Sequence, residues 1–509
     1  MNRIQVKDNR FVDQSGCEIL LHGINLVCKD RSKGYIGSWD QKAFKKLKQW
    51  GFNVVRLGVI WDGLEPLPGK FDLAYIERLR TVIHLAHQAG IYVFLDMHQD
   101  LFSAQFGDGA PAWATITDGF TYEPYPLWSD AYLHNEAVQR AFDHFWNNDL
   151  APDGVGIQEH YALAWRKLAE ELGREPNVIG YDLMNEPFMG SSVQQMLAPL
   201  MEQLAADSLE HGSVQLDASD ANESKAALSA SLLDPEHKLD LLQWLEHPDR
   251  FQSFLHALAP AQQAFERGPL MSMYNRVAKA IREVDQRGIL FMETHLFSNL
   301  GVPSGIEPIT NELGCRDPQQ AYAPHGYDLV TDTTYMNASS NTRVSILFDQ
   351  HEQTRKRLQM PMLIGEWGAY YGSQEAEASA LHVKGTLEKL LCGDTYWSYD
   401  DAAVDEYSSF NGIRRGIPHA VAGTLLAYGY DFHRRDYVMK WEEGVESSTI
   451  VYLPYAARLS KEQVSLSPNG TGFMIDRLPD SEAGYLVIPS AGEGDRELVI
   501  RDLATKESL

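Results

Sequence analysis

The sequence predicts an α/β fold, a (β/α)8 (TIM) barrel with a small β-sandwich at its C-terminal end. Short apolar runs alternate with helical stretches along most of the chain, which is typical of a parallel sheet covered by helices. No glycine-rich phosphate loop follows an early run, which disfavours the rival, an open doubly wound sheet. After about Asp431 the helical periodicity stops, and short strands separated by turns remain.

The elements follow one another in the order that a barrel requires. The chain opens with a hairpin, in which Ile4–Val6 and Phe11–Val12 flank the turn residues Asp8 and Asn9. The strand-like apolar runs are Leu21–Val27, Asn53–Ile60, Ile91–Met97, Val178–Met184, Gly288–Glu293, Ala321–Pro324, Met362–Trp367 and Thr395–Tyr399. Helical periodicity precedes the second, third and fourth runs, at Asp40–Trp50, Leu73–Ala89 and Glu159–Leu172.

These elements divide the chain into a barrel over residues 1–430 and a β-sandwich over 431–509. A long insertion at about 187–287 interrupts the barrel and holds an acidic piece, Asp217–Ser231. Its amphipathic part either packs on the barrel or forms a lid over a lipid tail; the apolar residues concerned are Trp244, Leu245, Phe251 and Phe254. The sandwich either stabilises the barrel or binds carbohydrate.

Charge and composition exclude several classes of function. The 509-residue chain has a formal net charge of −26, so it is a poor partner for nucleic acid and for anionic membranes. Its four cysteines show neither disulfide-framework nor metal-ligand spacing. No signal peptide and no apolar stretch of ~20 residues is visible. We expect a cytoplasmic protein without stable membrane insertion, or a secreted one if a leader has been removed. The oligomeric state stays open.

Two acidic residues at the ends of apolar runs indicate the chemistry. Glu186 stands in Asn-Glu-Pro after the fourth run, and Glu366 stands in Gly-Glu-Trp-Gly at the seventh. The carboxyl ends of barrel strands carry active sites. Retaining glycoside hydrolysis needs two carboxyl groups about 5–5.5 Å apart, one acid/base and one nucleophile. The alternative, two unrelated structural acids, explains these two strand ends less well.

Other polar and aromatic residues stand at further strand ends. Arg56 is suited to hold a carboxylate, although a structural Arg–Asp pair is an equal alternative. The segment Asp96–Asp100 allows a metal site, but its residue types favour polar sugar contacts. Tyr327 is suited to donate a hydrogen bond to the nucleophile, and Trp397 to stack on a sugar ring. Burial in the core is the alternative for both aromatic residues.

With these residues assembled, the chain resembles glycoside hydrolase family 5, and within it the endoglycoceramidase and glucosylceramidase-related branch. The resemblance runs from Leu21–Asn25 (LHGIN) to about Tyr430. Its most specific stretch is Asp96–Thr115 (DMHQDLFSAQFGDGAPAWAT), and Asn135–Trp146 is a further match. General cellulases of the family carry Asn-Glu-Pro but lack the first of these stretches.

The resemblance implies a role for each matching residue. Glu186 matches the acid/base and Glu366 matches the nucleophile. Asn185 matches the residue that contacts the sugar 2-hydroxyl, and Trp397 matches the platform under the sugar next to the scissile bond. The remaining matches are Arg56, Tyr327 and His325 near the nucleophile, His98 and Asp100 at sugar-binding positions, and Lys29 as a glycan contact. The family uses no metal and no organic cofactor.

These inferences lead to one main hypothesis and two alternatives. We expect a retaining β-glycosidase that cleaves the β-glucosyl bond to a hydrophobic aglycone, with glucosylceramide or another glycosphingolipid as substrate. The first alternative is an exo-β-glucosidase or β-glucanase that acts on soluble or aryl β-glucosides. The second is a non-catalytic carbohydrate or lipid binder, which has no need of a proton-donating carboxyl. Endo and exo action both stay open.

Overall fold

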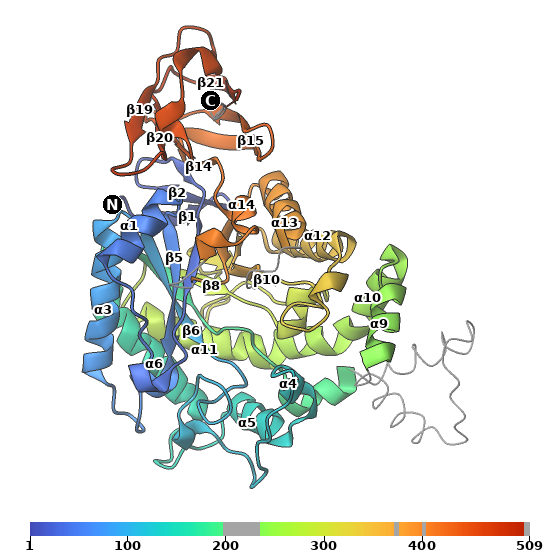
Figure 1. Cartoon of the computed structure of the whole chain (residues 1–509). Helices are drawn as coiled ribbons and strands as arrows, with labels where there is room; N and C mark the ends of the chain where they lie inside the picture. Colours follow the sequence, from blue (N-terminus) through green and yellow to red (C-terminus); the bar gives the residue numbers. More distant parts are fainter. Residues whose placement is uncertain (197–234, 371–375, 400–403, 503–509) are drawn as a thin grey trace.

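The computed structural model describes residues 1–196, 235–370, 376–399 and 404–502 (Figure 1). Its centre is an eight-stranded sheet in the order β11-β13-β4-β5-β6-β7-β8-β9. The strands are β4 (His22–Leu26), β5 (Val54–Ile60), β6 (Tyr92–His98), β7 (Val178–Asp182), β8 (Ile289–Met292), β9 (Gln320–Tyr322), β11 (Leu363–Ile364) and β13 (Gly393–Tyr396). A parallel bridge between Tyr322 and Met362 connects the two ends of the sheet and closes the barrel. Each predicted apolar run overlaps one of these strands, so the predicted barrel is confirmed.

The apolar runs are strands because both of their faces are covered. Every residue of β5 is buried, as expected for a parallel strand between a barrel interior and a layer of helices. The helices before the insertion are α1 (Gln41–Gln49), α2 (Trp61–Leu64), α3 (Leu73–Gln88), α4 (Asp130–His134), α5 (Glu136–Trp146) and α6 (Ile157–Leu172). The later ones are α12 (Asn341–Leu358), α13 (Ala376–Leu390) and α14 (Phe410–Ile413). The side chains of Asp40 and Asp72 cap the N-termini of α1 and α3.

Two short strands extend the barrel toward the site. β10 (His325–Gly326) follows β9, and β12 (Glu366–Trp367) follows β11. They pair in parallel, with His325 beside Glu366 and Gly326 beside Trp367. This register places two candidate site residues next to each other at the carboxyl end of the barrel.

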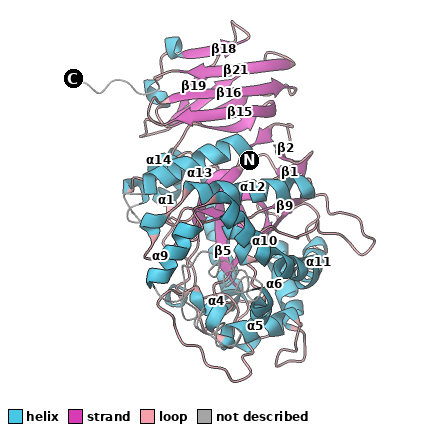
Figure 2. Cartoon of the chain, turned by 90° about the vertical axis from the view of Figure 1, so that its right-hand side faces the viewer, coloured by secondary structure: helices cyan, strands magenta, loops and turns pink. Residues whose placement is uncertain are grey.

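The C-terminal part consists of two antiparallel sheets that share one apolar core. One sheet has the order β1-β2-β3-β14-β17-β20-β19 and the other β15-β16-β21-β18. Figures 1 and 2 show both at the end of the barrel opposite α4 and α5. The strands are β1 (Ile4–Lys7), β2 (Arg10–Asp13), β3 (Glu18–Ile19), β14 (Ile417–Val421), β15 (Gly423–Asp431), β16 (Asp436–Glu443), β17 (Thr449–Leu453), β18 (Val464–Ser467), β19 (Met474–Arg477), β20 (Gly484–Ile488) and β21 (Gly494–Ile500).

The structure places the domain boundary differently from the sequence. After the barrel, the strands of these two sheets begin with β14 at Ile417. The expected boundary at 430 and 431 therefore falls inside β15. The expected boundary rests on Leu426–Tyr430 as the last stretch with a helical period, and this stretch is too short for its periodicity to distinguish helix from strand. The predicted N-terminal hairpin is present, but it belongs to the C-terminal sheet, since β3 pairs with β14. The first residues of the chain therefore connect the barrel to the appended domain.

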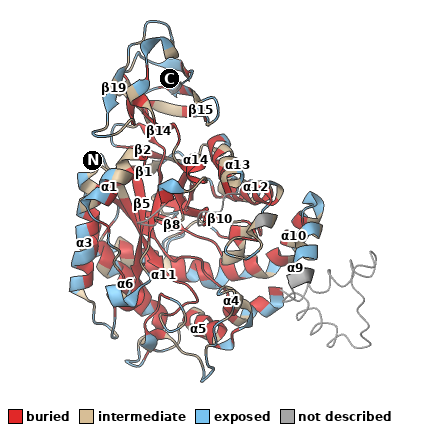
Figure 3. Cartoon of the chain, viewed as in Figure 1, coloured by how far each residue is buried: buried red, intermediate tan, exposed pale blue. Residues whose placement is uncertain are grey.

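The insertion packs on the barrel wherever the structure describes it. It contains α9 (Pro235–Trp244), α10 (Pro248–Phe265), a π-helical turn η4 (Glu266–Leu270) and α11 (Met271–Arg282). Figure 3 shows the barrel strand β5 as buried. Leu245 and Phe251 are buried in the barrel core, and Trp244 and Phe254 pack against it. These contacts support the packing interpretation over the lid. The acidic piece Asp217–Ser231 lies outside the described residues. Within the described ranges no helix combines the length and apolarity needed to cross a bilayer.

Candidate active site

The carboxyl ends of three strands bring Glu186, His325 and Glu366 together. A carboxylate oxygen of each Glu and a ring nitrogen of His325 lie within 4.8 Å of one another. Both carboxyl groups are largely buried, with Glu186 8% and Glu366 4% exposed. Glu186 has a φ of 42°, a left-handed conformation that is unfavourable for a residue with a Cβ atom. Its N–H donates to Glu293 Oε2 at 2.8 Å, which holds that conformation.

Arg56 of β5 is the centre of the charged network beneath the two carboxyl groups. Its guanidinium is fully buried. Nη1 donates to Glu366 Oε1 at 2.6 Å. The other carboxylate partners are Asp182 at 2.7 Å, Glu293 at 2.7 Å and Asp96 at 2.9 Å. Arg56 is therefore both the carboxylate-holding group and the structural Arg–Asp pair that the sequence offered as alternatives.

Burial and charge set the protonation of this network. Burial by itself would lower the pKa of Arg56, but Asp96 and Asp182 raise it well above its ordinary value. Burial raises the pKa of Glu293 to about 8 and those of Asp96 and Asp182 to about 6. Burial also raises the pKa of Glu366 to about 7, although the charges of His325 and Arg56 oppose that rise. The network therefore takes up protons close to neutral pH.

Each of the two central carboxyl groups has its own hydrogen-bond donors. The hydroxyl of Tyr327 donates to Glu366 Oε2 at 2.8 Å, so Arg56 and Tyr327 hold different oxygens of that carboxylate. Asn299 Nδ2 donates to Glu186 Oε1 at 2.9 Å, and His325 Nδ1 lies 2.9 Å from the same oxygen. His325 Nδ1 also lies 3.5 Å from Glu366 Oε2, so His325 faces both carboxyl groups.

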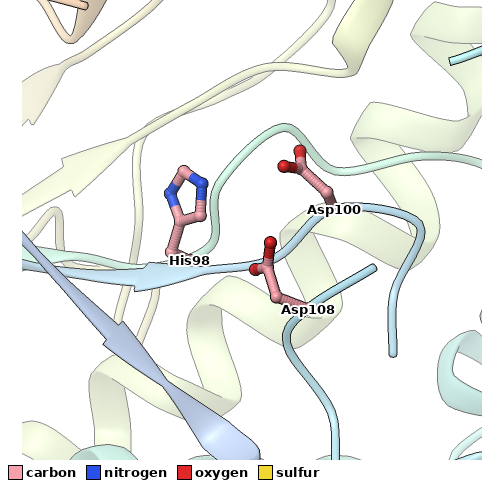
Figure 4. Close-up of side chains that lie close together, drawn as sticks. All are labelled: His98, Asp100 and Asp108. Carbon is pink, nitrogen blue, oxygen red and sulfur yellow. The ribbon is translucent and has the colours of Figure 1, made fainter. Parts of the chain in front are cut away.

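A second polar cluster lies beside the carboxyl pair. Figure 4 shows His98, Asp100 and Asp108 close together, and one ligand atom of each lies within 4.8 Å of the others. Such a trio could hold a metal ion, but Lys29 already forms an ion pair with Asp100. Within the described residues, His98 Nε2 and Asp108 Oδ1 are buried without a hydrogen-bond partner. Such atoms suit the hydroxyl groups of a polar ligand.

An aromatic side chain covers this cluster. The indole of Trp397 stacks on His98 with ring centroids 5.4 Å apart and an interplanar angle of 11°. The ammonium of Lys29 lies 4.8 Å from the centroid of the Trp397 ring. Trp397 is partly accessible rather than a core residue. Trp397 lines a cavity, and its role as a platform under a sugar ring stays a prediction.

One cavity of about 320 Å³ connects both groups of residues. It contains every predicted catalytic and substrate-binding residue, namely Lys29, His98, Asp100, Asn185, Glu186, Tyr327, Glu366 and Trp397. The two supporting residues, Arg56 and His325, lie buried beneath it. The rest of the wall is mixed. Its larger apolar side chains are Leu127, Trp128, Leu133, Leu296, Phe297, Leu300 and Leu329, and its polar ones include Ser129, Asp130, Asn299, Asp328, Thr331, Asp332 and Thr333. The cavity therefore joins the carboxyl pair to a wall that offers both apolar and polar contacts.

Sequence reasoning missed several residues of the site. Glu293 ends the apolar run of β8, so the strand-end rule that found Glu186 also applies to it. Asn25 lies near the end of the first run and accepts a hydrogen bond from Arg56 Nη1 at 3.1 Å. Asn299 has no such signal, because it lies in the long connection between β8 and β9. Only the folded connection brings it to Glu186.

Two protein-family models match this chain. The family model "Cellulase (glycosyl hydrolase family 5)" matches residues 12–213 and 258–403. The chain belongs to glycoside hydrolase family 5. A second model, the family 5 C-terminal domain, matches residues 415–500. That start agrees with the boundary at β14 rather than with the one expected at 430 and 431. As a family 5 member, the chain is a glycoside hydrolase.

Sequence relatives narrow the likeness within family 5. The chain is 31% identical to an endoglycoceramidase of Hydra vulgaris over 217 residues, 37% of this chain and 41% of the relative. It is 36% identical to endoglycoceramidase I of Rhodococcus hoagii over 190 residues, 37% of each chain. A glucosylceramidase of Aspergillus fumigatus is 32% identical over 248 residues, 37% of this chain and 32% of the relative. The matches thus span about two fifths or less of these relatives.

Solved structures resemble this chain over nearly its full length. Endo-glycoceramidase II from Rhodococcus sp. is 26% identical, covers 96% of this chain and 99% of its own, and has a TM-score of 0.72. Its complex with ganglioside GM3 gives a TM-score of 0.73 at 25% identity, covering 97% of this chain and 100% of its own. The predicted barrel, appended sheet domain and family are thus confirmed together.

Proposed function

We propose that this family 5 enzyme is a retaining β-glycosidase that cleaves the β-glucosyl bond to a hydrophobic aglycone, with a glycosphingolipid as substrate. The observation that carries the proposal is the cavity that the carboxyl pair shares with a set of apolar side chains, among them Leu127, Phe297 and Leu329. Its polar residues suit a sugar ring, and its apolar side chains suit part of a lipid chain. The endoglycoceramidase and glucosylceramidase relatives support the same substrate class.

Glu366 is the proposed nucleophile. Its carboxylate attacks the anomeric carbon and forms a glycosyl–enzyme bond, while the bond from that carbon to the aglycone oxygen breaks. Arg56 and Tyr327 each donate to one of its oxygens, which orients the carboxylate and favours its ionised form. The burial of this carboxyl group strengthens both interactions.

Glu186 is the proposed acid/base. It gives its proton to the leaving aglycone oxygen in the first step and takes a proton from water in the second. The water oxygen then bonds to the anomeric carbon, and the bond to Glu366 breaks. Oxygens of the two carboxyl groups lie within 4.8 Å of each other. This separation supports a retaining mechanism, because an inverting pair stands roughly 6.5–9.5 Å apart.

The sugar contacts are assigned to the polar and aromatic residues beside the carboxyl pair. Trp397 offers a flat face on which a glucose ring stacks. Asn185 stands next to Glu186, and contact with the sugar 2-hydroxyl is its proposed role. His98, Asp100 and Lys29 bind the other hydroxyl groups, through atoms that include the unpartnered His98 Nε2. No step requires a metal or an organic cofactor.

Product analysis tests the substrate. Purified protein is incubated in detergent with glucosylceramide and with lactosylceramide, and the released sugar is identified by mass. We expect glucose from glucosylceramide; lactose from lactosylceramide would add endo action. If neither lipid is cleaved while an aryl β-glucoside is, the enzyme is a soluble β-glucosidase and the proposal is wrong.

Two variants test the assignment of the carboxyl groups. Glu366→Gln and Glu186→Gln are isosteric changes, and each is expected to lower kcat by at least about 100-fold while thermal unfolding stays close to that of the wild type. With azide and an activated aryl glucoside, the product distinguishes the two roles: loss of the acid/base gives the β-glucosyl azide, whereas loss of the nucleophile gives the α-glucosyl azide. Normal turnover in either variant contradicts the assignment.

A further inference from the structure

A buried carboxylate outside the cavity contacts the segment that carries Asn299. Glu266 stands at the first position of the π-helical turn η4, between α10 and α11, and is fully buried. Pro269 in this turn lacks an N–H group, which accounts for the widened helical geometry. The turn directs Glu266 away from solvent and toward the connection between β8 and β9.

Both oxygens of Glu266 accept hydrogen bonds from that connection. Oε1 accepts from the N–H of His295 at 3.0 Å and lies 3.5 Å from Ser298 Oγ. Oε2 accepts from the Ser304 hydroxyl at 3.0 Å and from the N–H of Gly305. The donors lie at the two ends of one segment, residues 295–305. A single carboxylate therefore draws both ends of this segment together.

Close packing fixes the distance between the segment and the insertion. A Cβ atom on Gly305 would lie 2.8 Å from Gln263 Cβ and 2.9 Å from Gln263 Cα. Gln263 Nε2 also donates to the carbonyl of Pro303 at 3.1 Å. The segment therefore lies directly against α10, and only glycine fits at position 305.

Asn299, in the middle of the same segment, contacts the proposed acid/base Glu186 and two residues near it. Asn299 Nδ2 donates to Glu186 Oε1 at 2.9 Å. Asn299 Oδ1 accepts from the N–H of His325 at 3.2 Å, and its carbonyl accepts from the N–H of Tyr327 at 3.0 Å. Asn299 is thus fully engaged, and any shift of the segment displaces its amide from Glu186.

We propose that Glu266 is a positioning residue for catalysis: it fixes segment 295–305 so that Asn299 holds Glu186 in the orientation that delivers its proton. This inference rests on the acid/base role given to Glu186 under the proposed function. The proposal also assigns a role to the long insertion, which contains Glu266.

The carboxylate is required because every partner is a donor. Gln at position 266 places an NH2 group against N–H donors, and at least one hydrogen bond to the segment is lost. Burial raises the pKa of Glu266 to about 7, opposed by the hydrogen bonds of Gly305 and His295. Protonation of Glu266 therefore weakens the same contacts.

Two substrates that differ in their leaving group test the proposal. A 2,4-dinitrophenyl β-glucoside needs little protonation of its leaving oxygen, whereas a phenyl β-glucoside depends on the acid. We expect Glu266→Gln to lower kcat/KM for the phenyl glucoside by about tenfold or more. This loss is smaller than the full rate enhancement from a general acid, which is roughly 10²–10⁴-fold. The loss for the dinitrophenyl glucoside is expected to be far smaller.

Further variants separate positioning from folding. Ser304→Ala removes one donor to Glu266 and is expected to act in the same direction, more weakly, should Glu266→Gln fail to fold. Glu352→Gln, which removes a carboxylate paired with Arg355 and Lys356 on α12, is the matched control and is expected to leave the ratio of the two rates unchanged. In an Asn299→Ala background, Glu266→Gln should have little further effect, because both act on Glu186.

Each outcome decides the proposal. Equal losses on the two glucosides, or no loss, in a folded Glu266→Gln or Ser304→Ala protein overturn it. Full additivity with Asn299→Ala overturns it as well. If the wild type cleaves neither aryl glucoside, the proposed function itself fails, which is a result distinct from the failure of Glu266.

Discussion

Arg56 shows how one buried cation organises the site. Four carboxylates lie within 2.9 Å of its guanidinium, and none of them is exposed by more than a few per cent. Removing one partner of a buried ion pair leaves uncompensated charge in the interior. The planar fork of Arg also fits several carboxylates at once, which a Lys ammonium does not.

Arg56→Met is therefore expected to destabilise the protein by about 3–5 kcal/mol, measured as the free energy of unfolding in urea. Arg80→Met is the control, because Arg80 also faces three acids, Glu77, Glu171 and Glu175, but at the surface. Its loss is expected to be about 1 kcal/mol or less. Equal losses in the two variants would show that the Arg56 network adds no stability.

The ionisation of Glu366 is expected to set the acid limb of the pH–activity profile, near neutral pH. A nucleophile must be ionised, and burial raises the pKa of Glu366 to about 7. As pH rises through that value, the ionised fraction and kcat/KM rise together. In a pH series on an aryl glucoside, we expect the half-maximum of this limb well above pH 4.5 and close to 7.

Tyr327→Phe should move that limb to higher pH and lower the maximal rate. The Tyr327 hydroxyl donates to Glu366 Oε2 at 2.8 Å, and a hydrogen bond to the charged form lowers the pKa of a carboxyl group. Its loss therefore raises the pKa. A limb that moves to lower pH would contradict the contact. Tyr335→Phe, a tyrosine outside the cavity lining, is the control.

At the scale of elements, close packing decides where glycine is required. A Cβ on Gly23 of β4 would lie 1.8 Å from the carbonyl oxygen of Val54 on β5. Gly385 stands inside helix α13, and a Cβ there meets nothing within 4 Å. The same substitution should thus have opposite effects at the two positions.

Gly385→Ala is expected to stabilise the protein by about 0.5–1 kcal/mol, because alanine restricts the unfolded chain and suits a helix. Gly23→Ala is expected to abolish soluble expression or lower Tm strongly. Thermal melts of both variants measure the contrast. A loss of stability in Gly385→Ala would show that α13 does not tolerate a side chain there.

At the scale of the whole molecule, the appended domain completes the barrel. Arg415 precedes β14 and donates to Asp394 of β13 at 2.6 Å, and both are fully buried. Asp394 also accepts from Trp367 Nε1 at 2.9 Å, next to the nucleophile. Despite burial, the charge of Arg415 holds the pKa of Asp394 well below its usual range.

A chain ending before Arg415 is therefore expected to be insoluble or to unfold far below the full chain. Arg415→Met isolates the cause and should cost about 3–5 kcal/mol, whereas Lys440→Met, at an exposed pair in the same domain, should be nearly neutral. Urea unfolding measures both. A truncated barrel that melts like the full chain would show that the two parts are independent.

The sequence by itself determined the barrel, the appended β-rich domain and the residues at strand ends. These follow from local rules: apolar runs buried on two faces become parallel strands, and parallel strands bring their carboxyl ends to one edge. Glu186, Glu366, Arg56 and Tyr327 could be located in this way. The family resemblance then supplied their roles.

Only the tertiary structure decided the contacts made by connections and shared elements. Asn299 and Glu266 stand more than 30 residues apart in segments without strand-end signals, and packing alone joins them to Glu186. The observed domain boundary differs from the expected one for a related reason. Leu426–Tyr430 is too short for its hydrophobic period to distinguish helix from strand, and its pairing with β16 makes it part of a strand. Such long-range pairings depend on many residues at once, and no local pattern records them.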